Sequence, residues 1–295
     1  PQRAFPRMAK DSIFMALVAE LLTEIQTKQT LYRGDSTDPE WAERLGEVHL
    51  VVTSPPYFNL KTYPNRDGQL GQVSEFDEFL QKLVSVWRSC FDALVPGGRM
   101  AVVVGDVCLS RRRHGRHLVL PLHAAIQEQC RRIGFENLSP IFWHKISNQQ
   151  TESQRRGSYL GKPYEPNGII KNDVEYILLQ RKPGGYRQPA LEERVLSLIA
   201  KDRHDDWFRQ IWVNLNGAST VDHPAPYPVA LAERLIKMFS FVGDTVLDPF
   251  LGSGSTLVAA TSSGRNGIGI EVEPHYIQMS CSRLAAVDAE VEVHL

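Results

Sequence analysis

The sequence predicts a doubly wound α/β fold, in which helices cover both faces of a mostly parallel sheet. Short apolar runs rich in β-branched residues recur along the 295 residues and alternate with longer amphipathic segments. The run at residues 100–104, Met-Ala-Val-Val-Val, is apolar throughout, which is typical of a strand buried on both sides. Strands that alternate with helices form such layered sheets, and their ligands bind where the strands end.

In chain order, the first half is expected to open with an amphipathic helix over residues 11–29. A short strand follows and ends in Asp35, which could equally cap a helix within residues 36–44. The strand at residues 49–52 stops at two prolines, because proline cannot continue a central ladder. The further elements expected are a helix over 74–94 capped by Ser74, a strand over 99–105, a helix over 118–134 and a strand over 138–145.

The second half begins with a long irregular stretch, residues 146–172, rich in amide, guanidinium and tyrosine side chains. A loop of this length is uncommon in a compact domain unless it has a function, and such groups can read base edges in DNA. The elements expected after it are a strand over 172–179, a helix over 191–211 with an aromatic core cluster at its end, a helix over 229–241, strands over 245–247 and 266–271, and helices over 257–262 and 275–286.

An unusual strand exit follows residues 49–52 and reads Thr-Ser-Pro-Pro-Tyr-Phe. Its prolines hold Ser54 and Pro55 in an extended, non-helical turn. A rigid cup with a hydroxyl, carbonyls outside any ladder and the Tyr57 ring suits a flat ring that carries an amino group. Taken alone, the stretch is equally typical of a Pro-Pro turn beside an aromatic residue.

A second strand exit begins at Asp248 and reads Asp-Pro-Phe-Leu-Gly-Ser-Gly-Ser-Thr before an expected helix. Gly252 and Gly254 allow the backbone to approach a ligand closely, and a helix start offers free amide donors. The pattern lacks the third glycine of the dinucleotide fingerprint, which argues against a dehydrogenase.

Together the two stretches resemble the motifs of the amino-methylating DNA methyltransferases. Ser-Pro-Pro-Tyr resembles the catalytic motif of that family, Asp-Pro-Phe-x-Gly-Ser-Gly-Ser-Thr resembles its cofactor motif, and their order resembles its β group. The likeness spans residues 31–284. It implies S-adenosylmethionine as cofactor and a seven-stranded Rossmann-like sheet whose last strand is antiparallel, with an inserted DNA-recognition region. It also implies methylation of cytosine N4 or adenine N6 in a base flipped out of duplex DNA.

The resemblance and the residue types assign roles to the strand ends. Ser54 would accept hydrogen bonds from the target amine, and a serine at this place favours cytosine N4 within the family. The resemblance places Asp35 at the adenine amino group of the cofactor, while Asp248 can pair with its ammonium and Glu271 with its ribose hydroxyls. The residues expected in the site are catalytic Ser54, Pro55, Pro56 and Tyr57, and cofactor-binding Asp35, Asp248, Phe250, Gly252, Gly254, Ser255, Thr256 and Glu271.

The distribution of charge favours a nucleic-acid partner, although the net charge is only −1. Residues 111–117 form a basic run, and residues 145–187 are also rich in basic side chains. Such runs are equally typical of solvated loops, but beside these motifs they favour contact with the phosphates of double-stranded DNA. The residues expected to contact DNA are Arg111, Arg112, Arg113, Arg116, Lys145, Arg155 and Arg156.

Composition argues against several other classes of protein. No apolar stretch approaches the length of a membrane span, and residues 1–10 lack the apolar centre of a secretion signal, so a cytoplasmic protein without a membrane partner is expected. The four cysteines have no CxxC spacing, which argues against a metal site and a disulfide framework, and none has the setting of a nucleophile for ring-carbon methylation. A catalytically inactive DNA-binding subunit and an enzyme acting on RNA or protein are the alternatives.

The expected organisation is one methyltransferase domain with additions. Residues 30–145 and 173–182 form its catalytic part, and residues 223–295 form its cofactor-binding part. A helical extension, residues 1–29, could pack against a second subunit in a homodimer. Residues 146–172 are the target-recognition loop region, and residues 183–222 form a connecting segment that faces DNA.

Overall fold

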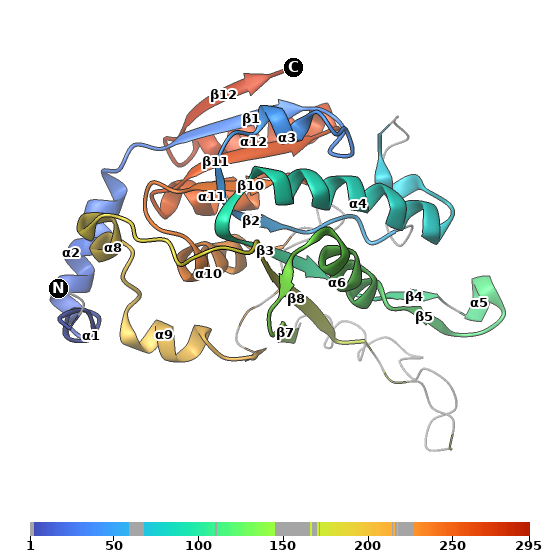
Figure 1. Ribbon diagram of the computed structural model, residues 1–295, viewed down its shortest axis with the longest axis horizontal. Helices are drawn as coiled ribbons and strands as arrows, with labels where there is room; N and C mark the ends of the chain where they lie inside the picture. Colours follow the sequence, from blue (N-terminus) through green and yellow to red (C-terminus); the bar gives the residue numbers. More distant parts are fainter. Residues whose placement is uncertain are drawn as a thin grey trace.

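The computed structural model describes residues 3–58, 68–109, 111–144, 166, 170, 172–213, 215, 217 and 227–295, with only the backbone of residues 112 and 113. A twisted ten-stranded sheet runs through the molecule, and helices cover both of its faces (Figure 1). This architecture confirms the doubly wound, mostly parallel α/β fold. Most of the expected recognition region, residues 146–172, lies outside the described residues.

The strands pair in the order β12-β1-β11-β10-β2-β3-β8-β7-β9, and β6 also pairs with β8. Neighbouring strands are parallel except at β8, which runs antiparallel to β3, β6 and β7. The bounds are β1 Lys28–Arg33, β2 Val48–Thr53, β3 Leu94–Val104, β6 Glu136–Asn137, β7 Ile141–His144, β8 Val174–Arg181, β9 Ile211–Trp212, β10 Thr245–Asp248, β11 Asn266–Glu271 and β12 Glu290–His294.

The prediction of a seven-stranded sheet is wrong. The sheet has ten strands in the described residues, and its antiparallel member is β8 rather than the last strand of the chain. Two of the additional strands, β6 and β9, contain only two residues each. The third, β12, pairs with β1 at the edge of the sheet. Residues 290–294 alternate polar and apolar side chains, which is the pattern of a half-buried strand.

The helices form two layers that bury alternate residues of the central strands. Val51 and Met100 pack in one core with α4 and α6, whereas Leu50 and Ala101 pack in the other with α10 and α11. The helices on the first face are α3 Trp41–Arg44, α4 Phe76–Ala93 and α6 Leu122–Ile133, and those on the second are α10 Val229–Phe239, α11 Ser255–Ser262 and α12 Pro274–Ala285. In the described part of the chain, no helix is both long and apolar enough to cross a membrane.

At one end of the sheet, the N-terminal helices α1 Phe5–Met8 and α2 Ser12–Thr23 lie beside α8 Leu191–Leu196 and α9 Lys201–Trp207 (Figure 1). The helix expected over residues 11–29 is therefore shorter, because residues 28–33 pair with β11 as β1. The helix expected over 191–211 is divided into α8 and α9, since residues 211–212 pair with β7.

Two further boundaries differ from the sequence pattern. The helix expected over residues 118–134 begins at Leu122, because Pro121 fits the start of a helix but not its interior. Residues 118–120 form a strand instead. The residue before the first turn of α4 is Glu75 and not Ser74, and no side chain caps this helix. The aromatic cluster expected in the core at the end of residues 191–211 is only partly buried. Trp207 and Trp212 are buried, and its other members are exposed.

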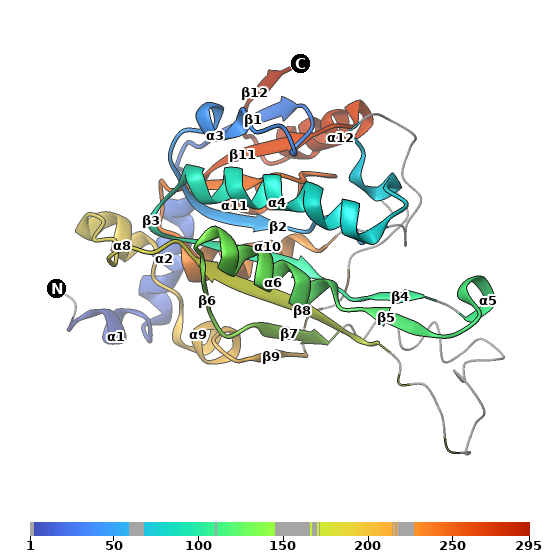
Figure 2. The same cartoon turned by 45° about the vertical axis from the view of Figure 1, so that its right-hand side comes forward.

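A hairpin follows β3 and leaves the sheet (Figure 2). Its strands β4 Val107–Leu109 and β5 Leu118–Leu120 pair antiparallel, and the short helix α5 Arg111–His114 lies at its tip. At its base, Asp106 Oδ1 lies 2.6 Å from His123 Nδ1 and accepts a hydrogen bond from the His123 N–H at 3.2 Å. The His123 ring stacks on the ring of Tyr176 with centroids 3.9 Å apart. These contacts tie the hairpin to α6 and β8.

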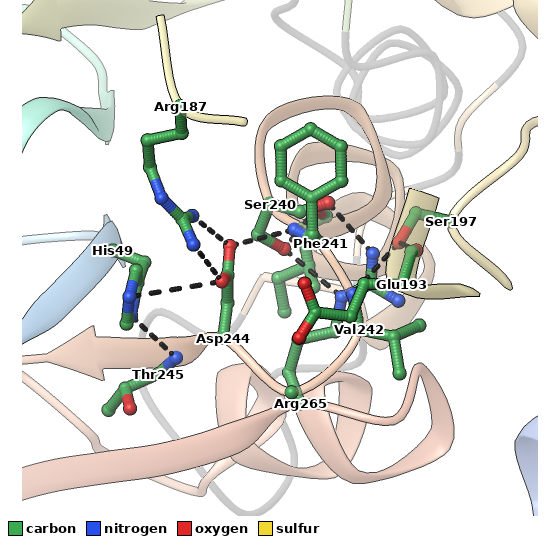
Figure 3. A network of polar contacts seen from close by, with 12 residues as sticks. His49, Arg187, Glu193, Ser197, Ser240, Phe241, Val242, Asp244, Thr245 and Arg265 are labelled. Carbon is green, nitrogen blue, oxygen red and sulfur yellow. Dashed lines mark hydrogen bonds and ion pairs between the residues drawn. The ribbon is translucent and has the colours of Figure 1, made fainter. Parts of the chain in front are cut away.

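A buried polar network joins the amino ends of the strands (Figure 3). Asp244 is 3% exposed and accepts hydrogen bonds from the Arg187 guanidinium at 2.5 and 2.6 Å. The Phe241 N–H donates to the same carboxylate at 2.8 Å. His49 Nδ1 accepts from the Thr245 N–H at 3.1 Å, and burial lowers the pKa of His49. This network holds the segment after β8 against the start of β10.

Replacement of Arg187 by methionine should destabilise the protein, because Asp244 would remain buried without its cation. Removing one partner of a buried ion pair costs about 3–5 kcal/mol. The Arg187 side chain is 27% exposed. We therefore expect a loss near the lower limit, about 3 kcal/mol in the free energy of unfolding, measured by urea titration.

Arg181→Met is the matched control, because Arg181 pairs with Glu136 at the surface. It should change the free energy of unfolding little. Equal losses in the two variants would contradict a special contribution from the Arg187–Asp244 pair.

Candidate active site

A cavity lies where β1, β2, β10 and β11 end. These strands are parallel neighbours, so their carboxyl ends meet at one edge of the sheet, as the fold predicts. Both strand exits contribute to the cavity wall. The expected site residues that line it are Asp35, Ser54, Pro55, Pro56, Phe250, Gly252 and Glu271.

The first strand exit forms one wall of this cavity. Ser54, Pro55 and Pro56 face it, and residues 54–57 belong to no ladder. Tyr57 is half-buried beside Gly105, where an added Cβ would lie 3.6 Å from Tyr57 Cε2. Phe58 turns inward instead: it is 4% exposed and packs against aromatic rings of α4. Its φ of 51° lies in the left-handed region and redirects the chain.

Asp248, at the start of the second strand exit, is sealed from the cavity with 0% exposure. Its Oδ1 accepts hydrogen bonds from the Thr53 hydroxyl at 2.7 Å and the Phe250 N–H at 3.0 Å. Its Oδ2 accepts from the hydroxyls of Thr256 at 2.5 Å and Tyr227 at 3.1 Å. Burial raises the pKa of Asp248, and these donors oppose the shift. We call these five residues the Asp248 cluster.

The end of the second strand exit supports the cavity from behind. Gly254 has a φ of 80°, and a Cβ there would lie 2.8 Å from Ser280 Oγ, so this glycine permits contact with α12. Ser255 and Thr256 are buried in the first turn of α11. Gly254, Ser255 and Thr256 therefore do not line the cavity, in contrast to Gly252. Their expected contacts with a cofactor stay predictions.

Glu271 ends β11 with its carboxylate at the cavity and is 9% exposed. Its Oε2 accepts a hydrogen bond from the Gly252 N–H at 2.8 Å, and its Oε1 accepts from the Glu273 N–H at 2.9 Å. Burial raises the pKa of Glu271 to about 7, although both amides oppose the shift. The carboxylate can accept further hydrogen bonds from a ligand, since an ionised carboxylate has about four acceptor positions.

Asp35, after β1, forms the opposite side of the cavity. Its Oδ1 accepts hydrogen bonds from the Thr37 N–H at 2.9 Å and the Thr37 hydroxyl at 2.8 Å. Its Oδ2 lies on the side of Gly68, where an added Cβ would come within 2.8 Å. The helix-cap interpretation is wrong, because α3 begins at Trp41 after Glu40 and Asp35 holds a local turn instead. Asp35 lines the cavity, and its contact with an adenine amino group stays a prediction.

Several lining residues were missed by sequence reasoning. Ser36 faces the cavity and donates a hydrogen bond to the Pro249 carbonyl, which joins the end of β1 to the second strand exit. Tyr276 enters from α12, and residues 68–70 enter from the segment before α4. Only the position of Tyr276 soon after Glu271 could have suggested that Tyr276 lines the cavity.

The expected DNA-binding residues are not all described. Arg111 and Arg116 are exposed at the tip of the hairpin. The side chains of Arg112 and Arg113, and all of Lys145, Arg155 and Arg156, lie outside the described residues. Asp106, which follows β3, does not line the cavity and lies at the base of the hairpin against His123.

The potential metal ligands and the four cysteines are dispersed over the described residues. No group of three or more potential metal ligands occurs there. Cys90 and Cys130 are buried, and burial raises the pKa of both thiols. Cys108 and Cys281 are half-buried and unpaired with other cysteines.

Comparison with known proteins gives independent evidence for the family of this chain. A family model for DNA methylase matches residues 48–282, a range that includes both strand exits. The Type II methyltransferase M.MjaI of Methanocaldococcus jannaschii is 34% identical over 85% of this chain and 89% of its own. The Type II methyltransferase M.ScaI of Streptomyces caespitosus is 45% identical over 87% of this chain and 81% of its own. The structure of TTHA0409 from Thermus thermophilus, complexed with S-adenosyl-L-methionine, is 47% identical with a TM-score of 0.75 and covers 90% of this chain and 98% of that chain.

The pKa of Glu271 predicts a pH dependence of nucleoside binding. An ionised carboxylate accepts hydrogen bonds from two ribose hydroxyls better than a protonated one. Because the pKa of Glu271 is about 7, its carboxyl group must lose a proton before it can bind the ligand below this pH. The dissociation constant should then rise up to about tenfold for each unit of pH. We expect this result in calorimetric titration with methylthioadenosine, which has ribose hydroxyls but no ionisable amino acid part.

Glu271→Gln should weaken this binding and remove its dependence on pH near neutrality. A dependence that persists unchanged in this variant would assign the titration to another group.

Proposed function

The chain belongs to the DNA methylase family, and we propose that it transfers a methyl group from S-adenosylmethionine to the N4 amine of a cytosine at a specific site in duplex DNA. The observation that carries the proposal is the shared cavity. Ser54, Pro55 and Pro56 form one wall, and Phe250, Gly252 and Glu271 form another. An amine-binding turn and a nucleoside-binding edge thus meet at one place.

The donors and acceptors of the cavity fit the nucleoside half of S-adenosylmethionine. Glu271 would hold the ribose hydroxyls, and Asp35 would accept a hydrogen bond from the adenine amino group. Phe250 and Tyr276 add aromatic surface to the same wall. When bound, the cofactor supplies an electrophilic methyl on a sulfonium.

Ser54 would prepare the target amine for methylation. An exocyclic amine on cytosine is a poor nucleophile, because its lone pair is delocalised into the ring. Hydrogen bonds from the amine to Ser54 Oγ and to the carbonyl of Ser54 or Pro55 would localise that lone pair. One of the two amine protons leaves when the N–C bond forms, and no covalent enzyme intermediate is needed. Alignment of the reacting atoms can supply up to about 7–11 kcal/mol.

A base in a duplex must leave the stack to reach this turn, which costs a few kcal/mol. Stacking on an aromatic side chain contributes about 1–3 kcal/mol per base and can offset that cost. We assign this stacking role to Tyr57, which follows the turn and is half-buried. We do not assign it to Phe58, because Phe58 packs in the core.

The hairpin is the described element best suited to hold DNA. Arg111 and Arg116 are exposed at its tip, and Asp106 and His123 fix its base. We assign phosphate contacts to this tip and recognition of the target sequence to residues 146–172. A homodimer stays a prediction; the exposed Ile13 and Leu17 on α2 are compatible with it.

The proposal is tested by transfer of labelled methyl from S-adenosylmethionine to mixed-sequence duplex DNA, followed by nucleoside analysis. We expect N4-methylcytosine, and we expect Tyr57→Ala to impair transfer while cofactor binding stays nearly normal. Product N6-methyladenine would reverse the base but keep the mechanism, because both amines present the same two donors. Cofactor binding without transfer to DNA would contradict the proposal and favour RNA or protein as substrate.

The contribution of the hairpin is tested by the salt dependence of DNA binding. Each phosphate contact contributes about 0.9 to the slope of log affinity against log salt. The double variant R111A/R116A should therefore reduce that slope by up to about 1.8. The matched control is R131A/R132A on α6, where both arginines pair with Glu128. An unchanged slope in the hairpin variant would place the phosphates elsewhere.

A further inference from the structure

The sequence pairs Asp248 with the ammonium group of the cofactor, whereas in the structure protein groups surround its carboxylate. The carboxylate is 0% exposed, and its two oxygens receive four hydrogen bonds from protein groups. An ionised carboxylate has about four acceptor positions. Asp248 is therefore saturated by protein donors and does not line the cavity.

Two of the four donors, Phe250 and Thr256, belong to the second strand exit itself, and the other two, Thr53 and Tyr227, come from elsewhere in the chain. Thr53 is the last residue of β2 and directly precedes Ser54. Phe250 lines the cavity, and Thr256 lies in the first turn of α11. Tyr227 lies just before α10. One side chain thus bonds to the strand exit that binds the amine and to the one that binds the cofactor.

The hydroxyls of the cluster are also connected to one another. The hydroxyl oxygens of Tyr227 and Thr256 are in contact with each other, and the Thr256 oxygen lies 3.4 Å from the carbonyl oxygen of Val52. Burial and the Asp248 charge raise the pKa of Tyr227 well above its usual value, so this phenol keeps its proton as a donor. The cluster therefore holds β2 at Thr53.

We propose that Asp248 and Thr53 are positioning residues that set the place of Ser54 relative to the cofactor-binding turn, and that Asp248 is not the ligand of the cofactor ammonium. The inference rests on the proposed function, because it concerns the alignment of the target amine with the methyl group. Methyl transfer requires the reacting atoms in line, and a misplacement of about 1 Å can lower the rate about 100-fold.

Thr53→Val tests the link to Ser54, since valine matches the shape of threonine but cannot donate to Asp248. We expect kcat to fall about 10- to 100-fold, while the dissociation constant for S-adenosylmethionine changes by less than about twofold. Thr53→Ser restores the hydroxyl and should recover most of kcat. The matched control is Thr30→Val in β1, which β11 and β10 separate from β2.

A kcat for Thr53→Val equal to that of the control would overturn the positioning role. So would a parallel loss of cofactor affinity, which would indicate a general loosening of the fold.

Asp248→Asn separates the two roles of the carboxylate without any methyl transfer. Its affinities for S-adenosylmethionine and for methylthioadenosine are compared, because only the former carries the ammonium. The positioning role predicts that both affinities change by the same factor. A loss confined to S-adenosylmethionine would restore Asp248 as the ammonium ligand. If wild-type protein binds both ligands but methylates no DNA, the proposed function fails while this comparison still stands.

Discussion

The parallel pairing of β10 with β2 is the constraint on which the rest of the structure depends. Leu50 lies opposite Val246 and Val51 opposite Leu247, so each pair faces the same helix layer. A slip of one residue would send each side chain to the wrong face of the sheet. The same slip would remove Asp248 from Thr53. The hydrophobic cores on both faces therefore enforce the register that brings the two strand exits together.

An acid ends two of the strands at this edge and closely follows a third, and the surroundings give the three carboxylates different chemistry. Asp248 is sealed from the cavity, and its two oxygens accept four hydrogen bonds from protein groups. Glu271 has a longer side chain that reaches the cavity, where incomplete solvation raises its pKa to about 7. Asp35 is half-buried and divides its two oxygens between a local turn and the cavity. Residue type alone does not distinguish a structural acid from one that binds a ligand.

The sequence was sufficient to predict the fold class and the central strands, because their buried runs are continuous and β-branched. The run at residues 49–52, for example, lies within β2 Val48–Thr53. Short strands such as β5 and β9 could not be predicted in this way, since each depends on a partner distant from its own local pattern.

The candidate site was predictable to the extent that its residues follow strands. Ser54, Gly252 and Glu271 belong to local motifs, and the fold class places strand ends together. Tyr227 carried no such signal: it precedes a helix, and only the packing of α10 against α11 brings its hydroxyl to Asp248. The burial of Asp248 was equally hidden, because solvent access at a strand end depends on all the segments that meet there.

The position of the hairpin explains how binding of DNA and capture of a base can be coupled without a large movement of the sheet. β3 lies beside β2, so the hairpin that follows β3 starts next to the turn that contains Ser54. Tyr57 and Glu175 lie beside Gly105, where an added Cβ would be in ordinary contact with both, at 3.6 and 3.4 Å. The Asp106–His123 contact then fixes the direction in which the hairpin leaves. Phosphates held at its exposed basic tip would keep the duplex close to the Tyr57 ring, so that a flipped base has a short path to Ser54.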